Sequence, residues 1–312
     1  MSESDFIVFI NVNINKRLME CSCSCSRIHR CALRYLRQCV GDSLLFSEFT
    51  VSLVKRYESF LSCKCLSLNT ISAYIRAIRS DYNQAVEQGL APFVPGLFRH
   101  VYTGIDGHAE RALDSGVLRC IASSPALPLP ASLEQSRLLF VLLFLLRGIP
   151  FVDMIHLRKC DLRGGVLTYR RQKTGKRLTV VLTPEATAIL EILRSRCTDS
   201  PYLFPFIRHS ATDTYREYQN SLRRFNYCLA RLAPALGLEG VHLSSYVARH
   251  SWATLAIGLN ENMKLVSTAM GHSSVKVTEN YLKQATEKQI DAMNRRVIAE
   301  VFMEVNKSPV TV

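Results

Sequence analysis

The 312-residue chain is 48% hydrophobic and 21% charged, which excludes wholesale disorder and favours two domains over one. Lys and Arg outnumber Asp and Glu by 39 to 26, and most of this basic excess lies after residue 110. The excess favours a nucleic acid as the partner, with an anionic membrane surface as the alternative. The longest apolar run, residues 138–146, is too short to cross a bilayer, and no secretory signal is apparent, so we expect a cytoplasmic, nucleoid-associated protein.

The first part of the sequence predicts a small helical domain. Helical spacing of apolar residues predicts one helix that ends at Gly41, a second over residues 49–61 and a third that begins at Ser67. A stretch rich in Pro and Gly then indicates a linker. The predicted divisions are an unassigned segment over residues 1–25, a helical domain over 26–92, a linker over 93–110 and a second domain over 111–312.

The second domain is predicted to be mainly helical with a small antiparallel sheet. Alternation of apolar and polar residues over 166–182 indicates a β-hairpin with a basic turn, Lys173-Thr-Gly-Lys176. Thr183 and Pro184 are typical of a helix start. Helical spacing predicts the helices, over residues 112–122, 132–147, 183–196, 214–236, 244–258, 261–270, 274–282 and 287–302.

Two helix faces each allow two interpretations. Arg76 and Arg79 share one side of the third helix, which either faces DNA phosphates or is a solvated surface. The last predicted helix carries a narrow apolar stripe, which packs either on its own domain or on another protomer. The stripe consists of Ile290, Met293, Val297 and Val301.

The eleven cysteines favour reduced thiols, with metal binding as the alternative. Their clusters lack the C-x2-C spacing of structural zinc sites, because a one-residue gap is awkward for two ligands of one ion. These clusters are Cys21, Cys23, Cys25 and Cys31, followed by Cys63 and Cys65.

Four elements stand out in chain order. Each alone is a weak signal, because an arginine is usually a surface group and a tyrosine on a helix usually packs. Their combination and order make the signal specific. The elements are Arg147, the turn lysine Lys173, the segment Tyr246-Val-Ala-Arg249-His250, and the run from Gly271-His272 to Tyr281.

The segment from Tyr246 to Tyr281 resembles the C-terminal signature of the tyrosine recombinase and phage integrase family. That signature is His-x-x-Arg, a later Gly-His pair and, nine residues after its histidine, a nucleophilic tyrosine. Here His272 precedes Tyr281 by nine residues. The resemblance implies a tyrosine recombinase fold, in which the first domain is a SAM-like core DNA-binding domain and the second is catalytic.

The resemblance implies a site-specific recombinase that integrates, excises or inverts double-stranded DNA between specific sites. It also implies a homo-oligomer, a tetramer in the synapse, with a C-terminal helix exchanged between protomers. Accessory DNA-bending proteins are further implied partners, and neither a metal nor a nucleotide cofactor is implied. Ser67-Leu-Asn-Thr70, residues 94–98 and Arg147-Gly-Ile-Pro-Phe-Val-Asp153 are similar to the branch typical of Bacteroidetes integrases and invertases.

The resemblance also implies a role for each cationic residue. Arg147 and Arg249 would hold the nonbridging phosphate oxygens with their guanidinium groups. Lys173 would protonate the leaving 5′-oxygen, with Lys176 as the alternative acid. His272 would hydrogen-bond the phosphate.

Tyr281 would attack the phosphorus and form a 3′-phosphotyrosine, whose bond energy permits religation without ATP. Because a phenol has a reference pKa of about 10, the nearby arginines must favour the phenolate or a neighbouring group must accept its proton. Tyr281 is therefore the predicted nucleophile.

Two positions depart from the family pattern. The first catalytic arginine usually lies three residues before an acidic residue, but Pro150 stands three before Asp153. Arg147 can serve only if the local turn is wound differently, and Asp153 is expected to be a structural partner of a basic group. Tyr246 replaces the usual histidine and is expected to orient its neighbours by hydrogen bonding.

Two alternative functions remain open. A degenerate relative would bind DNA sites without cutting them, and the departures at Pro150 and Tyr246 make this conceivable. A type IB-like topoisomerase would relax supercoils through the same tyrosine ester. The presence of Lys173, Arg249, His272 and Tyr281 together argues against the degenerate relative. The short chain and the integrase-like first domain argue against the topoisomerase.

Overall fold

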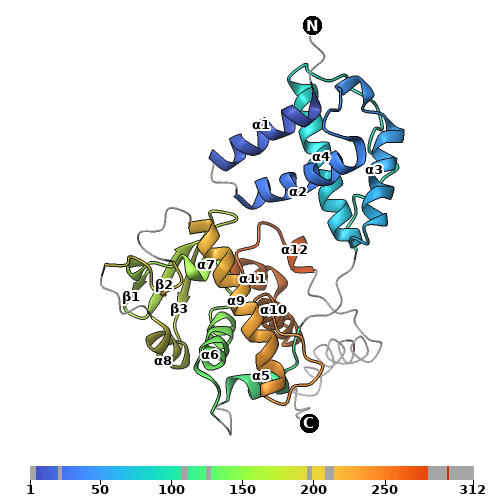
Figure 1. Ribbon diagram of the computed structural model, residues 1–312. Helices are drawn as coiled ribbons and strands as arrows, with labels where there is room; N and C mark the ends of the chain where they lie inside the picture. The colour runs from blue at the N-terminus through green and yellow to red at the C-terminus, as the bar shows by residue number, and fades with distance from the viewer. Residues whose placement is uncertain are drawn as a thin grey trace, which may run out of the picture. The chain divides into compact units, whose positions relative to one another are not determined.

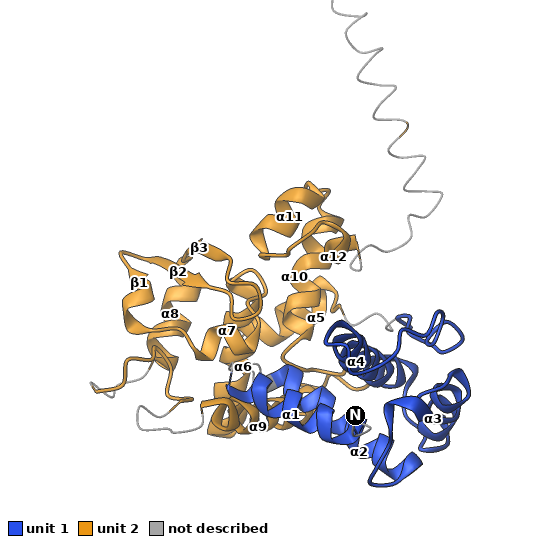
Figure 2. Cartoon of the chain, turned by 90° about the horizontal axis from the view of Figure 1, so that it is seen from above, with its two compact units in different colours: residues 1–109 blue, residues 110–312 orange. Residues whose placement is uncertain are grey.

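The computed structural model describes residues 5–19, 23–106, 112–123, 128–194, 199–207, 214–279 and 294 (Figure 1). The chain splits into two compact units, residues 1–109 and residues 110–312 (Figure 2). Tyr281 lies outside the described residues, as does the predicted last helix apart from residue 294.

The first unit is a bundle of four helices. They are α1 (Phe6–Met19), α2 (Cys23–Val40), α3 (Val51–Cys63) and α4 (Leu68–Glu87), with a short 3-10 helix at Phe46–Glu48. The three predicted helices are confirmed as α2, α3 and α4. The side chains of Thr50 and Ser67 accept hydrogen bonds from the first turns of α3 and α4, which explains where these helices begin.

Helix α1 occupies a segment for which the sequence pattern predicts no element. Phe6, Ile10 and Ile14 are buried along one side of α1. Val8 and Val12 are each 60% exposed on another side. Apolar residues on both sides hide the helical period, because the period is visible only when the exposed face is polar.

A buried carboxylate joins α1, α2 and α4. Asp81 on α4 is fully buried, and it accepts a hydrogen bond of 2.8 Å from Arg17 of α1. His29 Nδ1 of α2 lies 2.6 Å from the other carboxylate oxygen. Asn13 of α1 also points its amide toward Asp81, at 3.4 Å, and donates to Gln84 at 3.0 Å. A single acidic side chain therefore fixes the packing of three helices.

Replacing Asp81 by alanine should destabilise the protein by about 3–5 kcal/mol, because Arg17 would lose its buried counter-charge and His29 its buried hydrogen-bond partner. Asp42, which forms an exposed ion pair with Arg37, is the matched control. Asp42→Ala should cost less than about 1 kcal/mol. Urea unfolding of the full chain measures both changes. Equal, small losses would show that the buried pair contributes no more than a surface pair.

The second unit packs helices around a central apolar helix and a small sheet. Its elements are α5 (Ser115–Ala122), α6 (Ala131–Leu145), α7 (Phe151–Ile155), a 3-10 helix (Lys159–Asp161), β1 (Leu162–Arg163), β2 (Val166–Arg170), β3 (Arg177–Val181), α8 (Pro184–Leu193), α9 (Thr214–Ala235), α10 (Val247–Gly258), α11 (Met263–Ala269) and α12 (Lys276–Glu279). Helix α6 contacts α5, α8, α9 and α10, which explains its nearly continuous apolar sequence.

The predicted hairpin is confirmed as strands β2 and β3. The three strands are antiparallel in the order β1-β2-β3. Leu167 pairs with Val180 and both are buried, whereas Arg170 pairs with Arg177 and both are exposed. The alternation therefore directs one face of the hairpin into the core and leaves the turn that carries the lysines at the surface.

Two further expectations concern thiols and membranes. Eight cysteines of the described residues are free thiols, namely Cys25, Cys31, Cys39, Cys63, Cys65, Cys120, Cys160 and Cys228. No group of three or more metal-ligating side chains occurs in the described part of the chain. Within the same residues, no helix is both long and apolar enough to cross a bilayer.

Candidate active site

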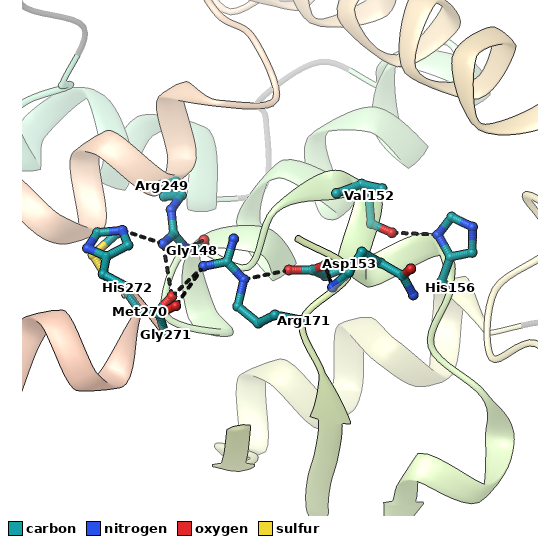
Figure 3. A network of polar contacts seen from close by, with 10 residues as sticks. Gly148, Val152, Asp153, His156, Arg171, Arg249, Met270, Gly271 and His272 are labelled. Atoms are coloured by element: carbon teal, nitrogen blue, oxygen red, sulfur yellow. Dashed lines mark hydrogen bonds and ion pairs between the residues drawn. The ribbon is translucent and has the colours of Figure 1, made fainter. Parts of the chain in front are cut away.

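Arg249 is the centre of a polar network between α10, the turn after α6 and the turn after α11. The side chain lies on α10 and the residue is only 3% exposed. Its guanidinium donates to the Gly148 carbonyl at 2.7 Å and to the Met270 carbonyl at 2.9 Å, and it lies 2.7 Å from His272 Nε2 (Figure 3). Sequence reasoning predicted that Arg249 and His272 act together, and the structure brings them into contact.

His272 is held in its neutral form. Burial and the charges of Arg249, Arg171, Lys176 and Lys173 lower the pKa of His272 to about 4. The neutral ring must therefore accept the Arg249 hydrogen bond at Nε2 and carry its proton at Nδ1. Nδ1 lies 2.8 Å from the Thr278 hydroxyl, to which it donates. Both ring nitrogens are thus engaged within the protein.

A second buried arginine, Arg171, belongs to the same network. It donates to Asp153 at 2.9 Å, to the Met270 carbonyl at 2.9 Å and to the Gly271 carbonyl at 3.2 Å. The expectation that Asp153 is a structural partner of a basic group is confirmed by this ion pair. Sequence reasoning missed Arg171, although its signal was present: it follows Leu167 and Tyr169 in the alternation that faces the core.

The two glycines of the network are required by close approaches. Gly271 has φ +66°, and a Cβ atom there would lie 2.8 Å from side-chain atoms of Arg171 and Leu178. Gly148 also has φ +66°, and its Cβ would lie 2.8 Å from the Arg249 Cα. Any side chain at either position would push an arginine out of the network.

Arg147 follows α6 in a left-handed conformation, with φ +60°. Two consecutive left-handed residues, Arg147 and Gly148, make the unusual turn that this position was expected to need. The Arg147 guanidinium donates to the Thr179 carbonyl of β3 at 3.3 Å. Burial raises the pKa of Tyr169, and the charge of Arg147 acts against that rise. Arg147 therefore lies beside the network, at the sheet.

The hairpin turn brings its two lysines toward His272. Lys173 and Lys176 are both exposed, and both of their charges act on His272. The turn is closed by hydrogen bonds from the Arg171 amide to the Lys176 carbonyl at 2.9 Å and from the Gly175 amide to the Arg171 carbonyl at 2.8 Å. Either lysine is thus available to a substrate at this surface.

Tyr246 stands at the start of α10 and is 47% exposed. Its ring packs edge to face against the His250 ring, with 4.8 Å between the ring centroids. The Tyr246 hydroxyl has no hydrogen bond to any described residue. The carbonyls that hold Arg249 are those of Gly148 and Met270. An orienting role for Tyr246 stays a prediction.

The two predicted DNA-binding arginines lie on the first unit. Arg76 and Arg79 are exposed on α4, as the helical spacing requires. Arg76 makes a long hydrogen bond of 3.4 Å to the Ser72 carbonyl. Within the described part of the chain neither arginine has an ion-pair partner.

The fold is shared with known recombinases. The chain superimposes on the Tn1549 transposon integrase with a TM-score of 0.68 at 15% identity, covering 95% of this chain and 100% of that chain. It superimposes on the XerH site-specific recombinase with a TM-score of 0.61 at 17% identity, covering 88% of this chain and 78% of that chain. The predicted tyrosine recombinase fold is thereby confirmed.

Two curated relatives are similar in sequence. The chain is 27% identical over 166 residues to tyrosine recombinase XerA of Pyrococcus furiosus, a match that spans 52% of this chain and 55% of that protein. It is 22% identical over 283 residues to tyrosine recombinase XerA of Thermococcus onnurineus, a match that spans 80% of this chain and 97% of that protein.

Family models match both parts of the chain. The phage integrase SAM-like domain matches residues 5–95, which contain the four helices of the first unit. The phage integrase family model matches residues 127–288, more than half of the chain. Because that match includes Arg249, His272 and the segment leading to Tyr281, the chain belongs to the phage integrase family.

Proposed function

We propose that this protein is a site-specific DNA recombinase that cuts and rejoins DNA through a 3′-phosphotyrosine on Tyr281. The observation that carries the proposal is the direct contact of Arg249 with His272, two residues predicted to bind one phosphate. Arg147 and the hairpin lysines lie around the same network. The narrower resemblance to Bacteroidetes integrases stays a prediction.

The geometry supports a phosphoryl transfer in which positive charge is supplied by side chains. Attack on a phosphodiester builds negative charge on the nonbridging oxygens, and fixed guanidinium groups stabilise that charge. Arg249 is already held in place by the protein, so little reorganisation is needed. Because both nitrogens of His272 are engaged, its contact with the phosphate requires that the phosphate replace one of these partners.

DNA is the proposed partner. The excess of Lys and Arg favours a polyanion, and the solved relatives are described as complexes with transposon right end DNA and with palindromic difH substrate. We propose a tetramer in the synapse, accessory DNA-bending proteins and a nucleoid-associated, cytoplasmic location. Arg76 and Arg79 are proposed to contact phosphates.

The direct test is covalent capture on DNA. The chain should form a protein–DNA adduct on a supercoiled plasmid that carries the DNA flanking its own coding sequence. Tyr281→Phe should form none, because it lacks the attacking oxygen. Tyr227→Phe removes the hydroxyl of an exposed tyrosine of α9 and should behave like the wild type. An adduct in Tyr281→Phe would refute the assigned nucleophile.

The same plasmid separates the alternatives. A degenerate relative binds the plasmid without any adduct. A topoisomerase relaxes supercoils but joins no two sites. Recombinant junctions, detected by amplification across them, are expected only of a recombinase.

The position of the adduct, located by sequencing, defines the mapped cleavage position. Lys173→Ala should slow cleavage at this position by about 100-fold, a typical contribution of general acid catalysis. Cleavage should recover on a duplex whose scissile 5′-oxygen is replaced by sulfur, because a thiolate leaves without a proton. Lys176→Ala is the matched comparison from the same turn. Recovery of Lys176→Ala instead of Lys173→Ala would assign the acid to Lys176.

Changing Arg76 and Arg79 together to alanine should weaken DNA binding. The slope of log K against log salt should fall by about 1.8, since each lost phosphate contact removes about 0.9. A double change of Arg37 and Lys55, which pair with Asp42 and Glu58, alters the net charge equally and is the control. Equal slopes for both variants in a gel-shift titration would show that Arg76 and Arg79 belong to a solvated surface and do not contact DNA phosphates.

A further inference from the structure

Arg171 connects three segments that are distant in the sequence. Its side chain binds the carboxylate of Asp153 on α7 and the carbonyls of Met270 and Gly271, about 100 residues further on. Figure 3 shows Arg171 lying between Asp153 on one side and the Met270–His272 turn on the other. The residue is 8% exposed, so these contacts are made largely out of water.

We propose that Arg171 is a positioning residue that holds the lysine-bearing hairpin and the Gly271–His272 turn in one fixed geometry. The proposal rests on the proposed recombinase function, because it concerns groups that act in that reaction. Arg171 is only 8% exposed, and the proposal assigns it no contact with the substrate. It acts through Lys173 on one side and through Arg249 and His272 on the other.

The contact on the hairpin side is made at the base of the turn. Asp153 uses both carboxylate oxygens, one for the Arg171 side chain at 2.9 Å and one for the Gln172 backbone amide at 2.8 Å. Gln172 directly precedes Lys173. Because a carboxylate that binds two neighbouring groups restrains both, the direction in which the chain enters the turn is fixed.

The contact on the other side is made with a shared acceptor. The Met270 carbonyl accepts from Arg171 and from Arg249, each at 2.9 Å. A displacement of Arg171 therefore changes the surroundings of the residue that binds the phosphate. Gly271 permits this approach, since a Cβ there would lie 2.8 Å from the Arg171 side chain.

Arg170, the last residue of β2, provides a matched comparison because it directly precedes Arg171. It is an arginine one residue earlier, and the alternation of the strand directs it to the exposed face. Its side chain donates to the Gly175 carbonyl at 3.2 Å and reaches neither Asp153 nor Met270. Arg170→Gln thus removes an equal charge one residue away, and the contact it loses is the hydrogen bond to the Gly175 carbonyl.

The kinetic test compares Arg171→Gln, Arg171→Lys and Arg170→Gln on duplexes that span the mapped cleavage position. Single-turnover cleavage by Arg171→Gln should be slowed by about 100-fold, the scale of a misplaced catalytic group. Arg171→Lys keeps the charge opposite Asp153 and should show an intermediate rate. Arg170→Gln should cleave like the wild type. Rates are compared at equal amounts of folded, DNA-bound protein.

The sulfur-containing duplex identifies the groups through which Arg171 acts. It removes the need for the acid, so Lys173→Ala should recover fully. Arg171→Gln should recover only in part, because Arg249 and His272 remain displaced. Full recovery would mean that Arg171 acts through Lys173 alone, and wild-type rates on both duplexes would mean that it positions nothing. Either result overturns the proposal.

A nuclear magnetic resonance titration of His272 in the free protein needs no DNA. Four cations act on this ring, from Arg249, Arg171, Lys176 and Lys173. His272 should titrate at a higher pH in Arg171→Gln than in the wild type. In Arg170→Gln it should titrate at the same pH as in the wild type. If Arg171→Gln fails to fold, Arg171→Lys is tested in its place. This variant retains the charge, so slower cleavage supports the positioning role and an unchanged cleavage rate contradicts it.

The two readouts separate this proposal from the proposed function. A wild type that forms no adduct on any duplex contradicts the recombinase. An unchanged His272 titration in folded Arg171→Gln would still contradict the proposal without any DNA, because Arg171 would then have no influence on the ring.

Discussion

The second unit depends on one backbone carbonyl, that of Met270, which accepts hydrogen bonds from two buried guanidinium groups. Bringing Arg171 and Arg249 to one acceptor is costly, because like charges repel strongly away from water. The Asp153 carboxylate and the Gly148 carbonyl offset that cost. Their arrangement joins the turn after α6, the hairpin and the turn after α11, and it leaves a net positive charge next to His272.

Much of the fold follows from local patterns. Helical spacing predicted α2, α3 and α4, and alternation predicted the hairpin, because in each case one face is polar and the other apolar. Helix α1 escaped prediction because Val8 and Val12 are apolar but exposed. Helix α7 was missed for a different reason, since five residues are too few to establish a period.

The site was predictable to the extent that its residues lie in a recognisable order along the chain. Arg249 and His272 were named because their segment resembles the tyrosine recombinase signature, and they are in contact. Arg171 was not named as a site residue: the alternation that continues from β2 indicates that it is buried, but its partners are 18 and 99 residues away and no local pattern identifies them. The neutral state of His272 was equally hidden, since it results from the cations that the fold gathers around the ring.

The left-handed backbone conformation of Arg147 lowers the stability of the folded chain, whereas its side chain is assigned a role in the reaction. A non-glycine residue in this conformation costs about 1 kcal/mol or more, a strain that glycine would relieve. A chain with glycine at this position would fold more stably but would lose a guanidinium beside the network. Arg147 therefore supplies its guanidinium at a cost in folding stability.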